Sequence, residues 1–154
     1  MSQLRLWSCI VTIVAVMACA AWPAAAHDEG AAKSKQIVTA FYNLFFRDHK
    51  PAEAFERYGA DKYIQHNPRV PDGKAAVIGF FTPYFQANPE ARNEIKRAIA
   101  DGDLVVLHVH SKKNSADRGR AIVDIFRVEK GRVVEHWDVV QDIPESAANS
   151  NTMF

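Results

Sequence analysis

Three segments in the first half of the chain carry apolar residues at intervals of three and four, a pattern that predicts amphipathic helices. The first covers 37–45 and ends at a polar stretch. The second is short, covers 51–58 and begins with a proline, which fits the first turn of a helix, and Gly59 supplies the stop. The third covers 74–86, where Pro83 is expected to kink the last turns.

After residue 89 the pattern changes to an alternation of apolar and polar positions, which predicts β-strands. Turn signals separate four such runs, at 92–101, 103–112, 119–129 and 132–141. Successive hairpins would join these runs into an antiparallel sheet. The short polar segment 63–68 ends at a proline and is expected to be irregular chain.

The order of these elements predicts an α+β fold, in which three N-terminal helices pack on one face of a curved, mainly antiparallel four-stranded sheet. Such a sheet can curl around the helices into a cone that is open at one end. A cavity lined by the concave sheet face is a common binding site for a small ligand. The sequence therefore predicts a ligand pocket.

The N-terminal segment has the pattern of a secretory signal peptide. Arg5 precedes an apolar run over 6–21, and the small residues 24–26 follow it. Cleavage near Ala26 would export the protein to the periplasm or the medium. A retained membrane anchor and lipidation at Cys19 are the alternatives, although the apolar run is shorter than the roughly 20 residues that a membrane span needs.

The remaining chain is expected to form one domain. After the signal segment 1–26, the small polar residues 27–35 read as a flexible lead-in. A single domain is expected over 36–144, and a small polar tail over 145–154.

The amino-acid composition excludes several classes of function. Both cysteines, Cys9 and Cys19, lie in the signal segment, so the mature chain would contain neither a disulfide nor a catalytic thiol. Loss of Arg5 would leave 18 of the 19 basic side chains against 18 acidic ones. This balance argues against nucleic acid as a partner, and against a membrane surface beyond the export signal.

Polar residues that interrupt the apolar strands are the candidates for chemistry, because burying a histidine or carboxylate without a partner costs a few kcal/mol. The hairpin near Lys130 decides which of them share a face. A two-residue turn would pair Glu129 with Arg132, whereas a three-residue loop would pair Val128 with Arg132. The three-residue loop is favoured, because lysine is a poor residue for a left-handed turn position and Gly131 is a good one.

On that register Asp124 lies opposite His136, and one sheet face carries Asp124, Phe126, His136 and Asp138. A face that mixes apolar and ionisable side chains is typical of a pocket lining. His108 and His110 share one face of the neighbouring strand, but the loop between the strands leaves open which face this is.

Asp138 is the first candidate for catalysis, because a carboxylate in an apolar cavity is suited to take and return a proton near neutral pH. The alternative is a surface carboxylate paired with Arg120 or Arg132. His66 would lie near the mouth of the cavity, where its imidazole could donate to a developing oxyanion. The alternative for His66 is a loop residue that bonds nearby backbone.

The spacing of His108 and His110 suggests a metal site, since two histidines two positions apart on a strand can chelate one ion. Asp124 or His136 could complete the ligand set. The glutamate that a cupin places four or five residues after such a pair is missing here, so the simpler interpretation is that His108 bonds in the pocket and His110 lies at the surface.

Two strings resemble one known family. The segment Tyr63-Ile64-Gln65-His66-Asn67-Pro68, followed by Pro71-Asp72-Gly73, and the run 123–138 resemble the SnoaL-like polyketide cyclases, with a likeness that spans 37–144. The resemblance implies the cone-shaped fold of nuclear transport factor 2, which ketosteroid isomerase and limonene epoxide hydrolase share. It also implies a homodimer, because members of the family are usually dimers.

For chemistry, the resemblance implies an intramolecular aldol condensation that needs no metal or cofactor. An aspartate removes a proton next to a carbonyl, and neutral donors hold the enolate. The residues carried over are Asp138 as acid/base and His66 as a pocket donor. Our own hypothesis adds supporting roles for Asn67 and His108, with Asp124 and His136 as orienting groups.

Export argues against a nascent polyketide as substrate. The expectation is therefore a small apolar carbonyl compound that undergoes aldol, isomerase or hydrolase chemistry. The competing interpretation is a binding or dimeric interaction module of the same fold, with no catalysis.

Overall fold

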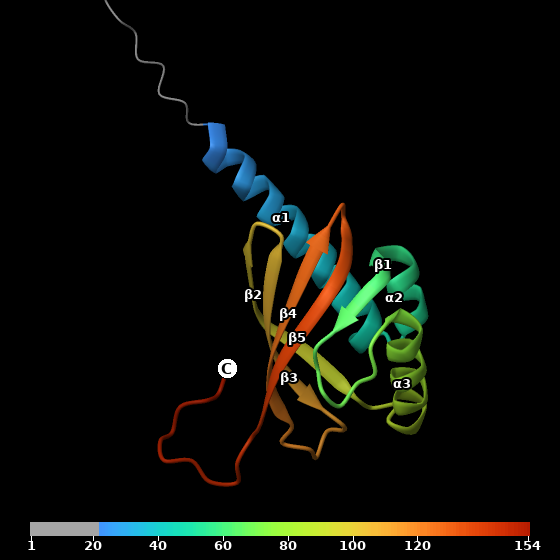
Figure 1. Ribbon diagram of the computed structural model, residues 1–154. Helices are drawn as coiled ribbons and strands as arrows, with labels where there is room; N and C mark the ends of the chain where they lie inside the picture. The colour runs from blue at the N-terminus through green and yellow to red at the C-terminus, as the bar shows by residue number, and fades with distance from the viewer. Residues whose placement is uncertain (1–21) are drawn as a thin grey trace, which may run out of the picture.

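The computed structural model describes residues 22–154 and shows helices packed on one side of a curved, five-stranded sheet (Figure 1). In that view α1 crosses behind the sheet, and α2 and α3 lie next to β1. The helices are α1 (Trp22–Tyr42), which continues into a π-helical turn (Asn43–Arg47), α2 (Pro51–Tyr58) and α3 (Lys74–Ala87). The strands are β1 (Gly59–Gln65), β2 (Arg92–Asp101), β3 (Leu104–Lys112), β4 (Arg120–Glu129) and β5 (Arg132–Asp142).

The sheet has the order β1-β5-β4-β3-β2, which corrects the expectation of four strands. Residues 63–65 belong to β1 and are not irregular chain as expected, whereas 66–68 follow the strand as irregular chain. Strands β2 to β5 form the predicted antiparallel hairpins, whereas β1 pairs in parallel with β5. The register of β1 is interrupted between Gly59 and Ile64. Because its sequence shows no alternation of apolar residues, its strand conformation depends on the edge that β5 offers and not on a local pattern.

Helix α1 begins well before the predicted start. Residues 27–35, expected as a flexible lead-in, lie within the helix, and Ala31 and Ser34 on its inner side are buried. Alanine and lysine, which are good helix formers, make up much of this stretch.

The predicted signal segment 1–26 falls outside the described residues up to Ala21. Within residues 22–154, no helix is both long and apolar enough to cross a membrane. The end of the chain leaves β5 and brings Phe154 onto the outer face of the sheet, with ring centroids 4.5 Å from His110.

The turn between β4 and β5 has two residues and not the predicted three. Lys130 and Gly131 both have positive φ, 51° and 76°, and Glu129 pairs with Arg132. A non-glycine residue in this conformation costs roughly 1 to 2 kcal/mol, which the packing of the two long strands outweighs. The register then shifts between Arg127 and Val128, which leaves Val134 as an extra residue in a β-bulge.

This bulge changes the expected pairing while preserving the expected face. Asp124 lies opposite Asp138 and not opposite His136, which pairs with Phe126 instead. Residues directly opposite each other in an antiparallel pair point to the same side. All four side chains therefore share one face, as predicted, and the structure shows that it is the concave face.

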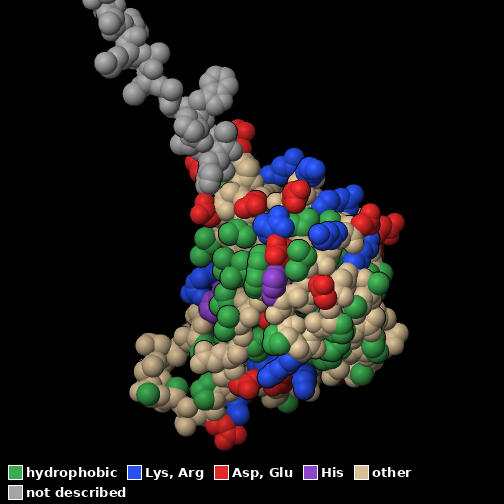
Figure 2. Space-filling model, viewed as in Figure 1, with side chains coloured by type: hydrophobic (Ala, Val, Ile, Leu, Met, Phe, Trp, Pro, Cys, Tyr) green, Lys and Arg blue, Asp and Glu red, His purple; other side chains and the backbone are tan. Residues whose placement is uncertain are grey.

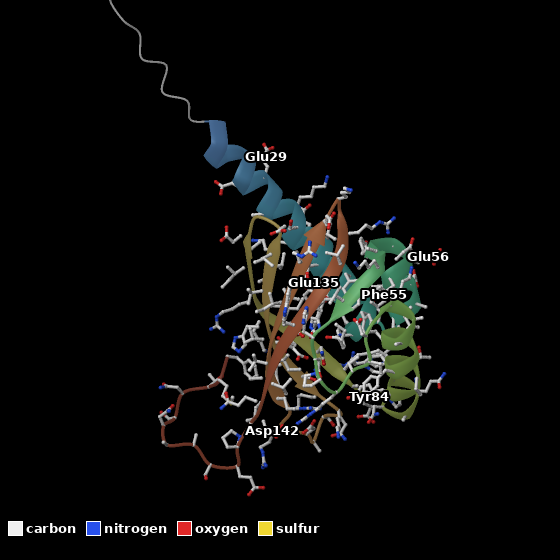
Figure 3. The ribbon with its side chains drawn as sticks, in the orientation of Figure 1. Glu29, Phe55, Glu56, Tyr84, Glu135 and Asp142 are labelled. Atoms are coloured by element: carbon white, nitrogen blue, oxygen red, sulfur yellow. The ribbon has the colours of Figure 1, made fainter. Side chains whose placement is uncertain are left out.

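Aromatic side chains build the core between the concave face and the helices. Phe41 of α1 is nearly inaccessible and meets Phe55 edge to face at 5.2 Å and Phe126 at 5.9 Å. In Figure 3 Phe55 points inward from α2, whereas its neighbour Glu56 points away from the domain. Burial of each such ring contributes about 1.5 to 3 kcal/mol. The same packing fixes the wall of the cavity described next.

Candidate functional site

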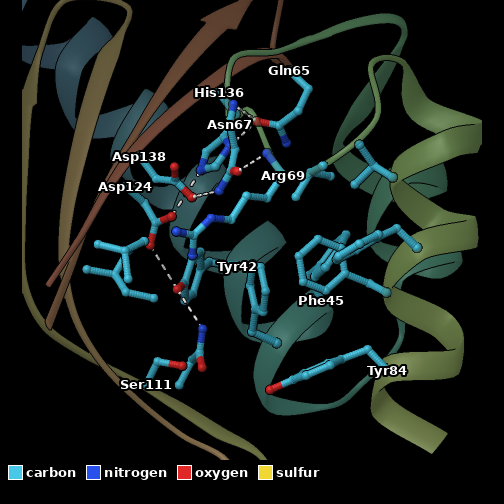
Figure 4. Close-up of a pocket in the computed structure, with 18 of the residues that line it drawn as sticks. Tyr42, Phe45, Gln65, Asn67, Arg69, Tyr84, Ser111, Asp124, His136 and Asp138 are labelled. Carbon is cyan, nitrogen blue, oxygen red and sulfur yellow. Dashed lines mark hydrogen bonds and ion pairs between the residues drawn. The ribbon is translucent and has the colours of Figure 1, made fainter. Parts of the chain in front are cut away.

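A cavity of ≈ 490 Å³ lies between the concave sheet face, α1, α3 and the loop after β1 (Figure 4). Its helical side is aromatic, and its sheet side carries the polar groups. The π-helical turn after α1 contributes two adjacent rings to the wall. The aromatic lining consists of Phe41, Tyr42, Phe45, Phe46, Tyr63, Phe80, Phe81, Tyr84, Phe85 and Phe126.

Asp124 lies at the centre of a buried hydrogen-bond network. One of its oxygens accepts a 2.9 Å hydrogen bond from the Tyr42 hydroxyl, and the other lies 2.9 Å from Nε2 of His136. Asn93 in turn donates to the Tyr42 oxygen at 2.9 Å. The Asp124 and His136 side chains are only 5% and 9% exposed, so the pair is shielded from water.

The hydrogen-bond partners of the two His136 ring nitrogens indicate which of these nitrogens carry a proton. Nδ1 of His136 lies 2.9 Å from Oε1 of Gln65, and that same oxygen accepts the backbone N–H of Asn67. The Asn67 contact identifies the Gln65 atom as oxygen, which can only accept. Since Asp124 faces the other ring nitrogen, both nitrogens of His136 face acceptors, which is the arrangement of an imidazolium in an ion pair with Asp124.

Asp138 has a different environment from its neighbour across the strands. Nδ2 of Asn67 donates to one Asp138 oxygen at 2.6 Å. Within residues 28–154, the other oxygen has no hydrogen-bond partner, and the side chain lines the cavity. Asp124 is thus fully bonded, whereas Asp138 keeps one oxygen available to a ligand.

Tyr42 is held neutral by its surroundings. Burial first, and then the nearby Asp124 carboxylate, raise the pKa of Tyr42 well above its usual value of about 10. Burial likewise raises the pKa of Tyr63. The Tyr42 hydroxyl therefore stays a hydrogen-bond donor to Asp124 at any pH near neutrality.

This raised pKa predicts a loss of stability in alkali. The unfolded chain releases the Tyr42 proton above about pH 10 and the folded chain does not, so the contribution is complete below that pH and falls as the pH rises towards the folded-state pKa. We expect Tyr42→Phe to reduce the slope of unfolding free energy against pH between about 9 and 11, measured by urea titration. Tyr58→Phe, at a half-buried tyrosine whose hydroxyl has no hydrogen bond to any described residue, is the control. Equal slopes in the wild type and Tyr42→Phe would contradict the assignment.

The structure brings together five of the seven predicted site residues. Asn67, Asp124, Phe126, His136 and Asp138 all line the cavity.

His66 and His108 do not line it. The backbone N–H of His66 donates to the carbonyl of His136, which continues the pairing of β1 with β5 and turns the His66 side chain to the face opposite Asn67. There it stacks on Trp137 at 4.7 Å and lies 2.9 Å from a Glu135 oxygen, so it cannot donate into the cavity.

His108 also lies on the outer face, because its neighbour Leu107 pairs with Asp124 on the concave one. His110 shares that outer face, so neither histidine can complete a metal site with Asp124 or His136. A different group could hold an ion: Asp124, His136 and Asp138 offer ligand atoms within 4.8 Å of one another. Hydrogen bonds already join two of the three.

Sequence reasoning missed several cavity residues. Tyr42 lies within the apolar stripe of α1, where nothing in the pattern marks its hydroxyl as functional. Gln65 belongs to the segment 63–68, which was expected to be irregular, and Arg69 follows directly after that segment. Alternation of Tyr63, Gln65 and Asn67 would have placed these three on one face if the segment had been treated as a strand.

Comparison with solved structures shows what this architecture is similar to. A SnoaL-like protein of unknown function from Burkholderia thailandensis is 19% identical, with a TM-score of 0.60 over 71% of this chain and 95% of that one. A provisionally assigned polyketide cyclase from Acidithiobacillus ferrooxidans is 22% identical, with a TM-score of 0.57 over 70% and 87%. A nuclear transport factor 2-like protein of unknown function from Mesorhizobium loti is 21% identical, with a TM-score of 0.59 over 72% and 93%.

At these identities the likeness shows the fold alone, which is the α+β fold of nuclear transport factor 2-like proteins. No curated protein matches the chain. The SnoaL-like domain, however, matches residues 38–136, which include β1, the loop after it and the Asp124–His136 pair. The chain therefore belongs to the family of SnoaL-like domains.

Proposed function

We propose that this protein catalyses proton abstraction next to the carbonyl group of an apolar compound, without a cofactor, and that Asp138 is the acid/base. The observation that carries the proposal is the contrast between the two facing carboxylates. Both oxygens of Asp124 are hydrogen-bonded, one to Tyr42 and one to His136. By contrast, one oxygen of Asp138 has no hydrogen bond among the described residues and faces the cavity. Two carboxylates in different environments commonly divide a structural and a chemical role.

The supporting groups hold Asp138 in place without neutralising it. Asn67 donates a single 2.6 Å hydrogen bond, and its own oxygen accepts the backbone N–H of Arg69, which fixes the amide. The His136 imidazolium lies beside the pair of carboxylates and balances part of their charge. The base is therefore oriented before a ligand arrives.

Arg69 is placed to stabilise the negative charge that forms on the substrate. Figure 4 shows its side chain running from the loop into the cavity, towards the two carboxylates. In the proposed step, Asp138 takes the proton from the carbon next to the carbonyl, and the electron pair of that bond moves into the enolate. The carbonyl oxygen gains the charge, which the Arg69 guanidinium can hold. Return of the proton, or attack of the enolate carbon on a second carbonyl, completes the reaction.

The cavity indicates the kind of substrate. A volume of ≈ 490 Å³ fits a small organic molecule, and its aromatic wall favours an apolar body. One solved structure with this fold is provisionally assigned as a ketosteroid isomerase, and two others are provisionally assigned as polyketide cyclases. A fused bicyclic ketone is therefore a suitable first probe.

The test is solvent deuterium exchange into 1-tetralone, followed by proton NMR in heavy water. We expect the protein to accelerate exchange at the carbon next to the carbonyl over the buffer rate. Exchange reports the first proton transfer alone, so it does not require that the natural product be known. A rate equal to that of buffer for 1-tetralone and for a panel of related ketones would overturn the proposal.

A binding protein without catalysis is the second candidate. It is favoured by the network around Asp124, which rigidifies the cavity whether or not a reaction follows. Such a protein would show saturable stabilisation by ketones in thermal unfolding and no exchange.

We also propose that a second copy of the chain covers the outer sheet face. Figure 2 shows apolar side chains gathered over β4 and β5, and Val139 and Ile99 are 68% and 62% exposed. Val123 lies between them on the same face, opposite Val139. A broad apolar sheet surface is a common site of isologous pairing, because two copies can pack face to face.

Val139→Glu is expected to convert a dimer into a monomer, because it would bury a charge at the centre of this contact. Light scattering after gel filtration measures the mass. Glu90→Lys, at an exposed position between α3 and β2, changes charge elsewhere and should leave the mass unchanged. A wild-type protein that is monomeric at micromolar concentration would contradict this proposal.

A further inference from the structure

The arginines of the described chain divide by whether their guanidinium groups have a partner. Six of the nine bond or pair with neighbouring groups, namely Arg47, Arg57, Arg97, Arg118, Arg127 and Arg132. The other three, Arg69, Arg92 and Arg120, have no hydrogen bond or ion pair through the guanidinium among residues 28–154. Two of these three, Arg69 and Arg120, line the cavity.

Arg120 lies in a polar row at one end of the concave face. It pairs with Ser111 on β3 and with Asp142 on β5, so all three side chains point into the cavity. The Ser111 hydroxyl is also without a hydrogen-bond partner among the described residues. Two neighbouring donors, one of them cationic, are thus left open to a ligand.

An apolar row separates these donors from the proposed base. Ile122 and Val140 pair with each other and line the cavity between Arg120 and Asp124. Arg120 and Asp124 are four residues apart on β4, which is about 13 Å along a strand. A ligand that reaches both ends of this face needs an apolar middle section.

We propose that the cavity binds an organic acid, with its carboxylate held by Arg120 and Ser111 and its carbonyl end beside Asp138. The position of the carbonyl end rests on the proposed function, whereas the carboxylate position rests on the unpartnered donors alone. The ligand class is a ketone on a compact ring system that carries a carboxylate on the side remote from the ketone.

The charges around Arg69 and Arg120 indicate which of the two arginines binds the ligand carboxylate. Arg69 points towards Asp124 and Asp138, and a carboxylate placed there would be repelled by both (Figure 4). At Arg120 the only nearby carboxylate among the described cavity residues is Asp142, which is exposed and forms no ion pair with Arg120. Asp117, which does not line the cavity, interacts with Arg120 electrostatically but forms no ion pair with it. The remote end of the cavity is therefore the favourable place for an anion.

The test compares 1-tetralone-6-carboxylate with its carboxamide, which has the same shape and no charge. Isothermal titration calorimetry at low salt measures the dissociation constants for the full chain. We expect the acid to bind about tenfold or more tightly than the amide, because a hydrogen bond between charged groups is roughly twice as strong as a neutral one. Added salt should reduce this ratio.

Variants locate the carboxylate. Arg120→Gln should abolish the preference for the acid, and Asp142→Asn should increase it by a few fold, because it removes the opposing charge. Arg97→Gln, on the outer face and hydrogen-bonded to His108, is the matched control and should change nothing. Equal binding of acid and amide by the wild type, or loss of the preference in Arg69→Gln but not in Arg120→Gln, would overturn the inference.

The same probe separates this inference from the proposed function. Tight binding of the acid without deuterium exchange would retain the anion site and remove the catalytic role of Asp138. Exchange into 1-tetralone by a protein that does not distinguish acid from amide would retain the catalyst and remove the anion site.

Discussion

Replacement of Asp138 by Asn is expected to lower the rate of deuterium exchange into 1-tetralone by about 10² to 10⁴. The amide has the shape of the carboxylate and still accepts the hydrogen bond from Asn67, but it cannot take a proton. The unfolding free energy should change by less than about 1 kcal/mol, because the side chain is only partly buried and retains its partner. Exchange by NMR and urea unfolding on the same preparation measure both quantities.

A matched carboxylate outside the cavity provides the control. Asp61 on β1 is fully exposed and, among the described residues, pairs only with Lys74, so Asp61→Asn should exchange at the wild-type rate. If Asp138→Asn retained the wild-type rate, Asp138 would not be the base. A parallel loss of rate and of stability would point to a structural role.

Removal of the Asp124 carboxylate is expected to have the largest effect on stability. Asp124→Ala should lower the unfolding free energy by about 3 to 5 kcal/mol, because it leaves the His136 imidazolium buried without its counter-ion. The Tyr42 hydroxyl would lose its acceptor as well. Urea titration monitored by circular dichroism measures the change.

Asp124→Asn distinguishes the ion pair from the hydrogen bonds. The amide oxygen can still accept from Tyr42, and the neutral form of His136 could accept from the amide nitrogen. A loss well below that of Asp124→Ala is therefore expected. If both variants were as stable as the wild type, the buried pair would contribute nothing to the fold.

The face shared by Asp124, Phe126, His136 and Asp138 could be predicted because alternation along a strand fixes which side chains point the same way. Which of these residues lie directly opposite each other could not be predicted. It depends on a left-handed Lys130 and on the bulge at Val134, and both are set by how the whole of β4 packs on β5. A single extra residue moved Asp124 from its predicted partner to Asp138, which changed the chemistry from a carboxylate and a histidine to two facing carboxylates.

His66 illustrates the opposite case. Its sequence context, between β1 and a proline, carries no apolar alternation, so the segment was expected to be irregular and His66 was assigned to the cavity mouth. Parallel pairing with β5 makes 63–65 part of a strand, and the hydrogen bond from the His66 N–H to the His136 carbonyl continues this pairing and turns His66 outward onto Trp137. The pairing partner lies about 70 positions later in the chain, and no local pattern records it.

The sequence by itself determined the helices, the four antiparallel strands and the residues that share the concave face, because these follow from periodicities of a few residues. Only the tertiary structure decided that Tyr42 and Gln65 bond the Asp124–His136 pair. It also decided that, among the described residues, Asp138 keeps an oxygen without a hydrogen bond and Arg120 faces the cavity without a hydrogen bond or ion pair. These features arise where segments distant in the chain meet, and their bonds depend on three-dimensional positions that no spacing in the sequence encodes.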